Sequence, residues 1–282
     1  MDLDKLGLGL NRVDARANQP ANPADSNAPA AKGDTDVTIS SFNLLGSSHT
    51  AAGGNKPGMA SGPERMKGAV KLLKQHGVDI VGFQEMEPNQ KKAFLRMAGD
   101  QYGIYSGSKG GKPDPANSIA WDKSKWDLVK GDSVAIPYFN GNIRKMPVVL
   151  LRNKKTGQET YVANFHNPAD TKRFHHQEKF REEAERIQVA LANRLRKTGR
   201  PVIITGDMNE RDDYYKAMTK GSPGMHASNA KNGRLKNPGI DWIFGSPNVT
   251  FSRHVRDRGA LVQRTTDHPM IISRARLKAA NR

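Results

Sequence analysis

Polar side chains with catalytic chemistry recur at, or just past, the ends of short apolar runs in this 282-residue sequence. Their carboxylate and amide oxygens are hard ligands of the kind that Mg²⁺ or Ca²⁺ prefers, and the chain has no Cys whose thiolate would favour a softer metal. Two histidines in the same set can transfer protons or stabilise charge on a phosphate. The set comprises Asn43, Glu85, His166, Asp207, Asn209, Asp241, Asp267 and His268.

Each of these positions, taken alone, has an ordinary structural explanation. The stretch Gly-Asp207-Met-Asn209 after a strand is typical of a turn, because Asp and Asn bend and cap the backbone well. A single Glu or His at a strand end is more often a surface residue than a ligand. Their joint occurrence at the ends of several strands indicates one site, because a rigid framework brings such ends together.

The elements that must position these residues alternate apolar runs with helical patterns. A capping-box sequence at 61–64 opens a predicted helix that Gly77 ends, and an apolar stripe over 180–195 marks a second helix that ends at Gly199. This pattern predicts one mixed α/β domain over residues 37–282. Its strands are expected at 37–42, 80–83, 118–121, 148–151, 161–165, 202–205, 240–244 and 270–273.

Six short motifs carry a family resemblance: Ser-Phe-Asn43, Phe-Gln-Glu85, Asn-Phe-His166, Gly-Asp207-Met-Asn209, Asp241-Trp-Ile and Thr-Asp267-His268-Pro. In this order, from about residue 37 to residue 274, they resemble the endonuclease/exonuclease/phosphatase superfamily, which includes deoxyribonuclease I. The resemblance implies an α/β fold of the DNase I type, a four-layer sandwich of two mixed β-sheets flanked by helices. It also implies a phosphodiesterase that uses Mg²⁺, with Mn²⁺ or Ca²⁺ as alternatives.

The resemblance further implies a role for each acidic and amide residue. Glu85 is expected to be the principal metal ligand, with Asn43 beside it and Asp267 on the metal or close to it. Asp207 would orient or deprotonate the attacking water, and Asn209 would hold a phosphate oxygen.

The imidazoles receive roles from the same resemblance. His268 would contact the scissile phosphate, and Asp241 would fix its tautomer and raise its basicity. His166 resembles a second histidine that stabilises the phosphorane or protonates the leaving oxygen. Asn117 resembles a polar strand residue that lines the same pocket.

Two departures from the family pattern concern the grip on substrate. After Glu85 the chain continues Met-Glu-Pro, where deoxyribonuclease I has an Arg that helps to hold DNA. A phosphate-contacting Arg is expected just before Pro147, and the offset leaves Arg144 and Lys145 together as candidates.

The charge of the chain favours a polyanionic partner. Its formal net charge is +17, from 45 Lys and Arg against 28 Asp and Glu, and the stretch 253–282 holds eight basic against two acidic residues. Cations displace counterions from phosphates, so we expect nucleic acid, in particular DNA, cleaved endonucleolytically with little sequence specificity. The loops 109–112 and 123–130 are expected near the cleft, whereas the basic residues of the helix over 178–197 alternate with glutamates and indicate a solvated face.

Two other functions remain open from the sequence. One is hydrolysis of a phospholipid, as in sphingomyelinases, or of an inositol phosphate. Sphingomyelinase-like members of the family usually need an exposed apolar or aromatic hairpin to reach the bilayer, and the sequence shows no such cluster. Trp121, Trp126 and Trp242 each lie in or beside a strand-like run that indicates core packing. The other is a nucleic-acid-binding protein that has lost activity, which the intact acid–base set argues against.

The first 36 residues differ from the rest in composition. They are rich in Ala, Asn, Pro, Asp and Gly, and no large apolar side chain occurs between about residue 15 and Val37, so we expect a disordered arm. The sequence has no typical signal peptide and no apolar run long enough to span a membrane. We therefore expect no membrane insertion, and take a monomer in the cytoplasm as the default.

Overall fold

The computed structural model describes residues 33–279, and the predicted arm lies mostly in residues 1–32, outside this range. Its helices are α1 (Ser47–Thr50), α2 (Gly62–His76), α3 (Pro88–Ala98), α4 (Glu178–Arg196), α5 (Asp212–Gly221) and α6 (Ala260–Thr265). Its strands are β1 (Thr35–Asn43), β2 (Ile80–Gln84), β3 (Tyr102–Lys109), β4 (Lys112–Asp122), β5 (Trp126–Pro137), β6 (Ile143–Asn153), β7 (Glu159–His166), β8 (Val202–Asp207), β9 (His226–Ala227), β10 (Ala230–Lys231), β11 (Arg234–Leu235), β12 (Asp241–Gly245), β13 (Val249–Asp257) and β14 (Met270–Leu277).

Every predicted strand and both predicted helices are present. β1 begins at Thr35, two residues before the predicted start of the domain, and the side chain of Thr35 is buried. The hydroxyl and the backbone N–H of Ser61 both donate to Glu64 at the start of α2, as the capping box predicts. The sequence patterns did not predict β3, β5 and β13, because glycines interrupt the apolar residues of β3 and β5 and β13 is mostly polar. The two-residue strands β9, β10 and β11, which were also not predicted, are too short to show a period.

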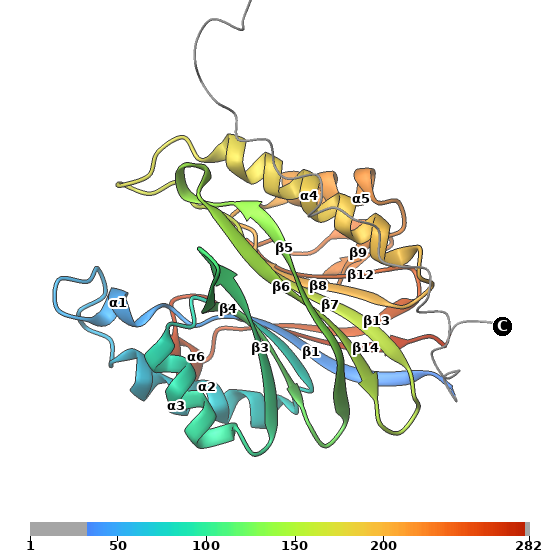
Figure 1. The fold of residues 1–282 in the computed structure, drawn as a ribbon, viewed down its shortest axis with the longest axis horizontal. Coiled ribbons are helices and arrows are strands. Elements are labelled where there is room, and N and C mark those ends of the chain that lie inside the picture. Colours follow the sequence, from blue (N-terminus) through green and yellow to red (C-terminus); the bar gives the residue numbers. More distant parts are fainter. Residues whose placement is uncertain (1–32, 280–282) are drawn as a thin grey trace, which may run out of the picture.

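The main strands form one folded sheet with two halves. Its order is β13-β14-β1-β2-β4-β3-β6-β7-β8-β12-β9, with β5 also paired to β6. A short pairing of Ser108 with Lys145 and of Lys109 with Arg144 is the link between the halves. The two predicted sheets are therefore the two halves of one hydrogen-bonded sheet that folds over onto itself. Figure 1 shows α2, α3 and α6 on one outer face and α4 and α5 on the other.

Three apolar layers hold these parts together. One, which includes Phe42, Phe83 and Phe94, fills the space between the first half-sheet and helices α2, α3 and α6. Another lies between the second half-sheet and α4 and α5. The third lies between the halves, and residues such as Ile39 and Ile203 come from both of them. The predicted α/β sandwich with helices outside is confirmed.

A smaller expectation is also met in the described part of the chain. Trp121, Trp126 and Trp242 are buried, at 6%, 1% and 1% exposed, so all three belong to the core. Among residues 33–279, no helix combines the length and the apolar character needed to cross a bilayer.

The alternation of side chains along each strand explains why catalytic residue types collect at one end of the sandwich. In β1, Ile39 lies in the layer between the halves, and Asn43, four residues on, lies on the same face. The same spacing relates Ile203 to Asp207 in β8. Because β7 and β8 are parallel, with His166 opposite Asp207, their carboxyl ends reach the same edge. The apolar layer between the halves therefore gives way to polar side chains at this edge.

A buried carboxyl group on α4, where this helix faces α5, is expected to make the stability of the protein depend on pH. Glu185 of α4 is 8% exposed, and burial together with the charges of Glu210 and Glu182 raises its pKa to about 7. Between its unfolded value, about 4.3, and 7 the folded state binds more protons than the unfolded state, so stability falls as pH rises through this window.

We therefore expect Glu185→Gln to raise the free energy of unfolding by roughly 1 kcal/mol at pH 8, after allowance for solvent screening, and to change it little at pH 4.5. Urea denaturation at the two pH values measures this difference. Glu183→Gln, at an exposed position of the same helix, serves as the control. An equal change at both pH values in the Glu185 variant would contradict the expectation.

Candidate active site

A buried polar layer forms the floor of the site. Asn164 of β7 is fully buried, and its Oδ1 accepts hydrogen bonds from Gln84 at 2.6 Å and Thr205 at 3.0 Å. Its Nδ2 donates across the halves to the carbonyl of Phe83 at 2.7 Å. Gly82 permits this approach, since a Cβ there would come within 2.0 Å of Thr205 Oγ1. The two half-sheets are thus locked together directly beneath the catalytic residue types.

Glu85 is presented from a strained turn immediately after β2. Its φ is +58°, in the left-handed region that a Glu adopts only when its surroundings enforce it. Asn43 Nδ2 donates to its Oε1 at 2.9 Å, and the backbone N–H of Gly46 donates to Oε2 at 3.0 Å. His49 Nε2 lies 3.3 Å from the same Oε2. Burial raises the pKa of Glu85, but His49, the charge of His166 and these donors outweigh it and hold the pKa well below its usual value.

Asp207 lies at the centre of the site at the end of β8, with 1% of its surface exposed. Asn43 Nδ2 donates to its Oδ2 at 3.0 Å, so this amide bridges Asp207 and Glu85. The Nε2 atoms of His166 and His268 each lie 3.7 Å from the same Oδ2. Burial and the charge of Asp241 raise the pKa of Asp207 to about 6 against the opposing effect of the two imidazoles. Such a carboxylate is poised to accept a proton near neutral pH.

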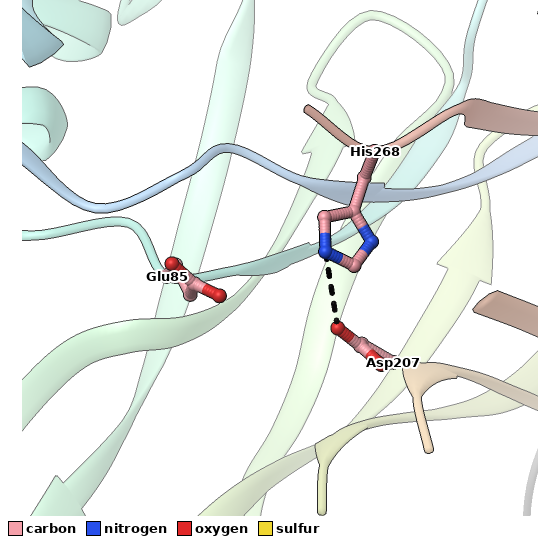
Figure 2. A group of neighbouring side chains, drawn as sticks. All are labelled: Glu85, Asp207 and His268. Atoms are coloured by element: carbon pink, nitrogen blue, oxygen red, sulfur yellow. Dashed lines mark ion pairs between the residues drawn. The ribbon is translucent and has the colours of Figure 1, made fainter. Parts of the chain in front are cut away.

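His268 is held by a carboxylate on its other ring nitrogen. Its Nδ1 lies 3.0 and 3.2 Å from the two oxygens of Asp241, which leaves Nε2 directed at Asp207. Burial lowers the pKa of His268, but the hydrogen bond and charge of Asp241 overcome this and raise it to about 10. The imidazole is therefore cationic at neutral pH. Figure 2 shows Glu85, Asp207 and His268 directed at a common space.

His166 has the opposite electrostatic setting. Burial lowers its pKa, partly offset by Asp207 and Glu85. The hydroxyl of Tyr138 lies 3.4 Å from its Nδ1, and the guanidinium of Arg144 lies 4.0 Å from the centroid of the Tyr138 ring. The site thus pairs one cationic imidazole with one that favours the neutral form, which suits two different steps of proton transfer.

The structure also distinguishes Arg144 from Lys145, which the sequence named jointly as candidates for contacting phosphate. Arg144 lies against Tyr138 and its charge reaches His166, whereas Lys145 is exposed and pairs through its backbone with Ser108. Arg144 is therefore at the site, and its neighbour points elsewhere along the strand, as alternation requires.

The remaining predicted residues lie around the same space. Asn209 has a φ of +50° and donates from Nδ2 to the carbonyl of Asn167 at 2.8 Å. Asn117, opposite Gln84 in the β2–β4 pair, is 2% exposed, and its buried Oδ1 has no hydrogen-bond partner. Asp267 forms an ion pair with Lys56 at 3.0 Å. All three remain predictions as substrate or metal contacts.

The donor set fits a hard divalent cation. Within residues 33–279, ligand atoms of Glu85, Asp207 and His268 all lie within 4.8 Å of one another. His268 in its cationic form has no free nitrogen for a metal, so the two carboxylates would supply the oxygen ligands that Mg²⁺ prefers. Asn43 turns its amide nitrogen to them, while its Oδ1 accepts the N–H of Leu45 at 2.9 Å, so in this arrangement it links the two carboxylates and its oxygen is already bonded. A cation bound there would supply Lewis-acid stabilisation of charge on a phosphoryl group.

One expected neighbour of the cleft lies elsewhere. The segment 123–130 was expected close to the site, but Lys125 pairs with Asp79, and Asp79 precedes β2 at the end opposite to Glu85. The length of β2 therefore separates these lysines from the catalytic edge. The loop 109–112 agrees better with its prediction. Its first residue, Lys109, is opposite Arg144 in the backbone pairing of β3 with β6 that links the two halves.

Sequence patterns missed several residues that build the site. His49 follows two serines in a stretch with no strand or helix signal, and Tyr138 lies in a turn. Arg65 was hidden in an amphipathic helix, yet it is 3% exposed and donates to the carbonyls of Leu44, Leu45 and Thr265. Asn164 could have been identified from the sequence, because it is a polar residue between apolar neighbours in a predicted buried strand.

Comparison with known proteins agrees with this geometry. The model of the endonuclease/exonuclease/phosphatase family matches residues 40–268, and the chain belongs to this family of phosphoester hydrolases. None of the curated proteins matches the chain.

Solved structures share the fold. A family protein from Bacteroides thetaiotaomicron has a TM-score of 0.69 at 19% identity, over 87% of this chain and 99% of that one. The mannosyl-6-phosphatase Bt3783 of the same organism has a TM-score of 0.61 at 18% identity, over 85% and 99%. TDP2 of D. rerio, in complex with a single-strand DNA product, has a TM-score of 0.61 at 17% identity, over 86% and 99%.

Proposed function

We propose that this phosphoester hydrolase is a divalent-metal-dependent endonuclease that cleaves DNA with little sequence specificity. The observation that carries the proposal is the convergence of Glu85, Asp207 and His268 within 4.8 Å, with Asp241 behind the imidazole. This arrangement combines a cation site, a proton acceptor and a fixed positive charge around one space.

The roles follow from the protonation of each group. Glu85, which stays ionised, would hold the Mg²⁺, which would supply Lewis-acid stabilisation, and Asp207 would accept the proton of the water that attacks the phosphorus in line. The cationic His268 neutralises charge that grows on the phosphoryl oxygens. His166, whose Nε2 lies 3.7 Å from Asp207 Oδ2, and Asn209, whose backbone N–H donates to Asp207 Oδ1, would stabilise the phosphate or the leaving oxygen.

Cations on both sides of the site support a polynucleotide substrate. On the His166 side, Arg144 lies against Tyr138, and Lys109 is opposite Arg144 in the backbone pairing of β3 with β6. On the His268 side, Arg256 lies close enough to Arg258, Arg211 and Asp241 for their charges to shift its pKa. Such groups contact phosphates and not base edges, so the expected cleavage is nearly independent of sequence. The TDP2 neighbour holds a DNA strand, which is consistent with this proposal.

Plasmid nicking tests the proposal. Supercoiled plasmid with Mg²⁺ is expected to be nicked, and EDTA or the double change Glu85→Ala/His268→Ala is expected to abolish nicking. If about four cations contact phosphates, binding should weaken on the order of a hundredfold between roughly 50 and 200 mM salt.

A lipid substrate is the second candidate, because Phe139 and Phe174 form an aromatic cluster beside the site that the sequence did not predict. Sphingomyelin vesicles and inositol phosphates therefore belong in the same assay. Turnover of either of these, with an intact plasmid, would replace the nuclease proposal.

A further inference from the structure

An aromatic cluster lies on the His166 side of the active site, where two loops meet. It consists of Tyr138 and Phe139, from the turn between β5 and β6, and Phe174, from the segment between β7 and α4. A hydrogen bond joins the two loops: the backbone N–H of Asn140 donates to Oε1 of Gln177, with an N···O distance of 2.8 Å. Figure 1 shows both loops side by side at the start of α4.

The rings form a continuous path from the catalytic imidazole to the surface. The ring centroids of Tyr138 and His166 are 5.6 Å apart, and those of Tyr138 and Phe139 are 4.5 Å apart. Phe139 and Phe174 then stack almost in parallel, with centroids 4.4 Å apart and planes 13° apart. Tyr138 is buried, whereas Phe139 and Phe174 are partly exposed. Aromatic surface therefore continues outward from the point of catalysis.

Cations accompany the rings along this path. The guanidinium of Arg144 lies 4.0 Å from the centroid of Tyr138, and that of Arg173 lies 5.3 Å from the centroid of Phe174. Asp170, the acidic residue of this loop, forms an ion pair with Arg181 at 2.7 Å. Rings interleaved with cations match a strand of nucleic acid, in which flat bases alternate with phosphates.

We propose that Phe139 and Phe174 form a stacking subsite for the nucleobase next to the scissile phosphate of a single-stranded segment, with Arg144 and Arg173 on the adjoining phosphates. This inference rests on the proposed nuclease function and deepens it. Bases inside a duplex are stacked on their neighbours and their faces are not accessible, so the subsite favours single strands or frayed ends over intact duplex. Every base offers a π-face, so the subsite adds affinity without sequence preference.

The test compares two substrates of equal charge on the same enzyme. One is a thymidine 12-mer, and the other is a 12-mer of tetrahydrofuran abasic units, which has the same phosphates and no bases. The ratio of kcat/KM between them is measured for the wild type, Phe174→Leu, Phe139→Leu/Phe174→Leu and the control Leu128→Ala. Leu128 is 40% exposed on β5. Because each ratio is taken within one protein, a partly unfolded variant does not distort it.

The wild type and Leu128→Ala are expected to prefer the thymidine strand by about tenfold or more, and the double variant is expected to lose most of that preference, since stacking contributes about 1–3 kcal/mol per base. A wild type that cleaves both strands equally, or a double variant that keeps the full preference, would overturn the subsite while leaving the nuclease intact. Failure of the wild type to cleave either strand, with turnover of sphingomyelin vesicles, would overturn the proposed function and the subsite together.

Discussion

Asp207→Asn is expected to lower kcat by about a thousandfold with little effect on folding. The buried carboxylate has a pKa raised to about 6 and lies 3.7 Å from both imidazole Nε2 atoms, and in the proposed mechanism it takes a proton from the attacking water. A positioned proton acceptor contributes about 10²–10⁴-fold to rate. The amide of Asn has nearly the same shape and cannot accept that proton. Single-turnover cleavage of a labelled oligonucleotide measures the change.

The control for this variant is Asp100→Asn, at an exposed position after α3. It should cleave at the wild-type rate. Circular dichroism and the melting temperature of Asp207→Asn should stay close to those of the wild type, because the variant removes buried charge. Retention of more than a tenth of kcat by a folded Asp207→Asn protein would show that another group accepts the proton.

Asp241→Asn is expected to lower kcat by about 10²–10³-fold at pH 8 and by less at pH 6. Asp241 overcomes the burial of His268 and raises its pKa to about 10, so the imidazole of the wild type is cationic at both pH values. Without that carboxylate the two largest effects that oppose burial are lost, so the pKa of His268 is expected to fall toward its usual value of about 6.5. The variant imidazole is then neutral at pH 8 and regains part of its charge as the pH falls.

The pH profile separates this electrostatic role from a structural one. Asp257→Asn is a matched control, because Asp257 pairs with His76 at 2.9 Å, as Asp241 pairs with His268, without forming part of the active site. That control should follow the wild-type profile. If Asp241→Asn lost the same factor at pH 6 and pH 8, the carboxylate would act by holding the loop and not by charging His268.

The outline of this site could be predicted from the sequence because strand geometry is regular. Asn43, His166 and Asp207 each follow apolar strand residues by an even number of positions, so they share the face that lies between the half-sheets. β1 with β2, and β7 with β8, are parallel pairs, so these ends meet at one edge. The alternation of residues within each strand and the parallel pairing between strands therefore both place these side chains at the same edge of the sheet.

The parts that could not be predicted depend on loops whose contacts are far apart in sequence. Phe139 and Phe174 stack although 35 positions separate them, and nothing in either loop has a period. His49 reaches Glu85 from a four-residue helix, α1, that no propensity would identify. The segment 123–130 was misplaced because charge alone does not say at which end of a strand a loop lies.

Calorimetric titration with Mg²⁺, paired with cleavage rates at the same metal concentrations, tests the central claim most directly. The wild type should bind the metal, and the cleavage rate should rise in proportion to occupancy and vanish in EDTA. Glu85→Gln should lose both the binding heat and the cleavage. Full cleavage by the wild type in EDTA, or by a Glu85→Gln protein that binds no metal, would contradict metal-dependent phosphodiester hydrolysis at this site.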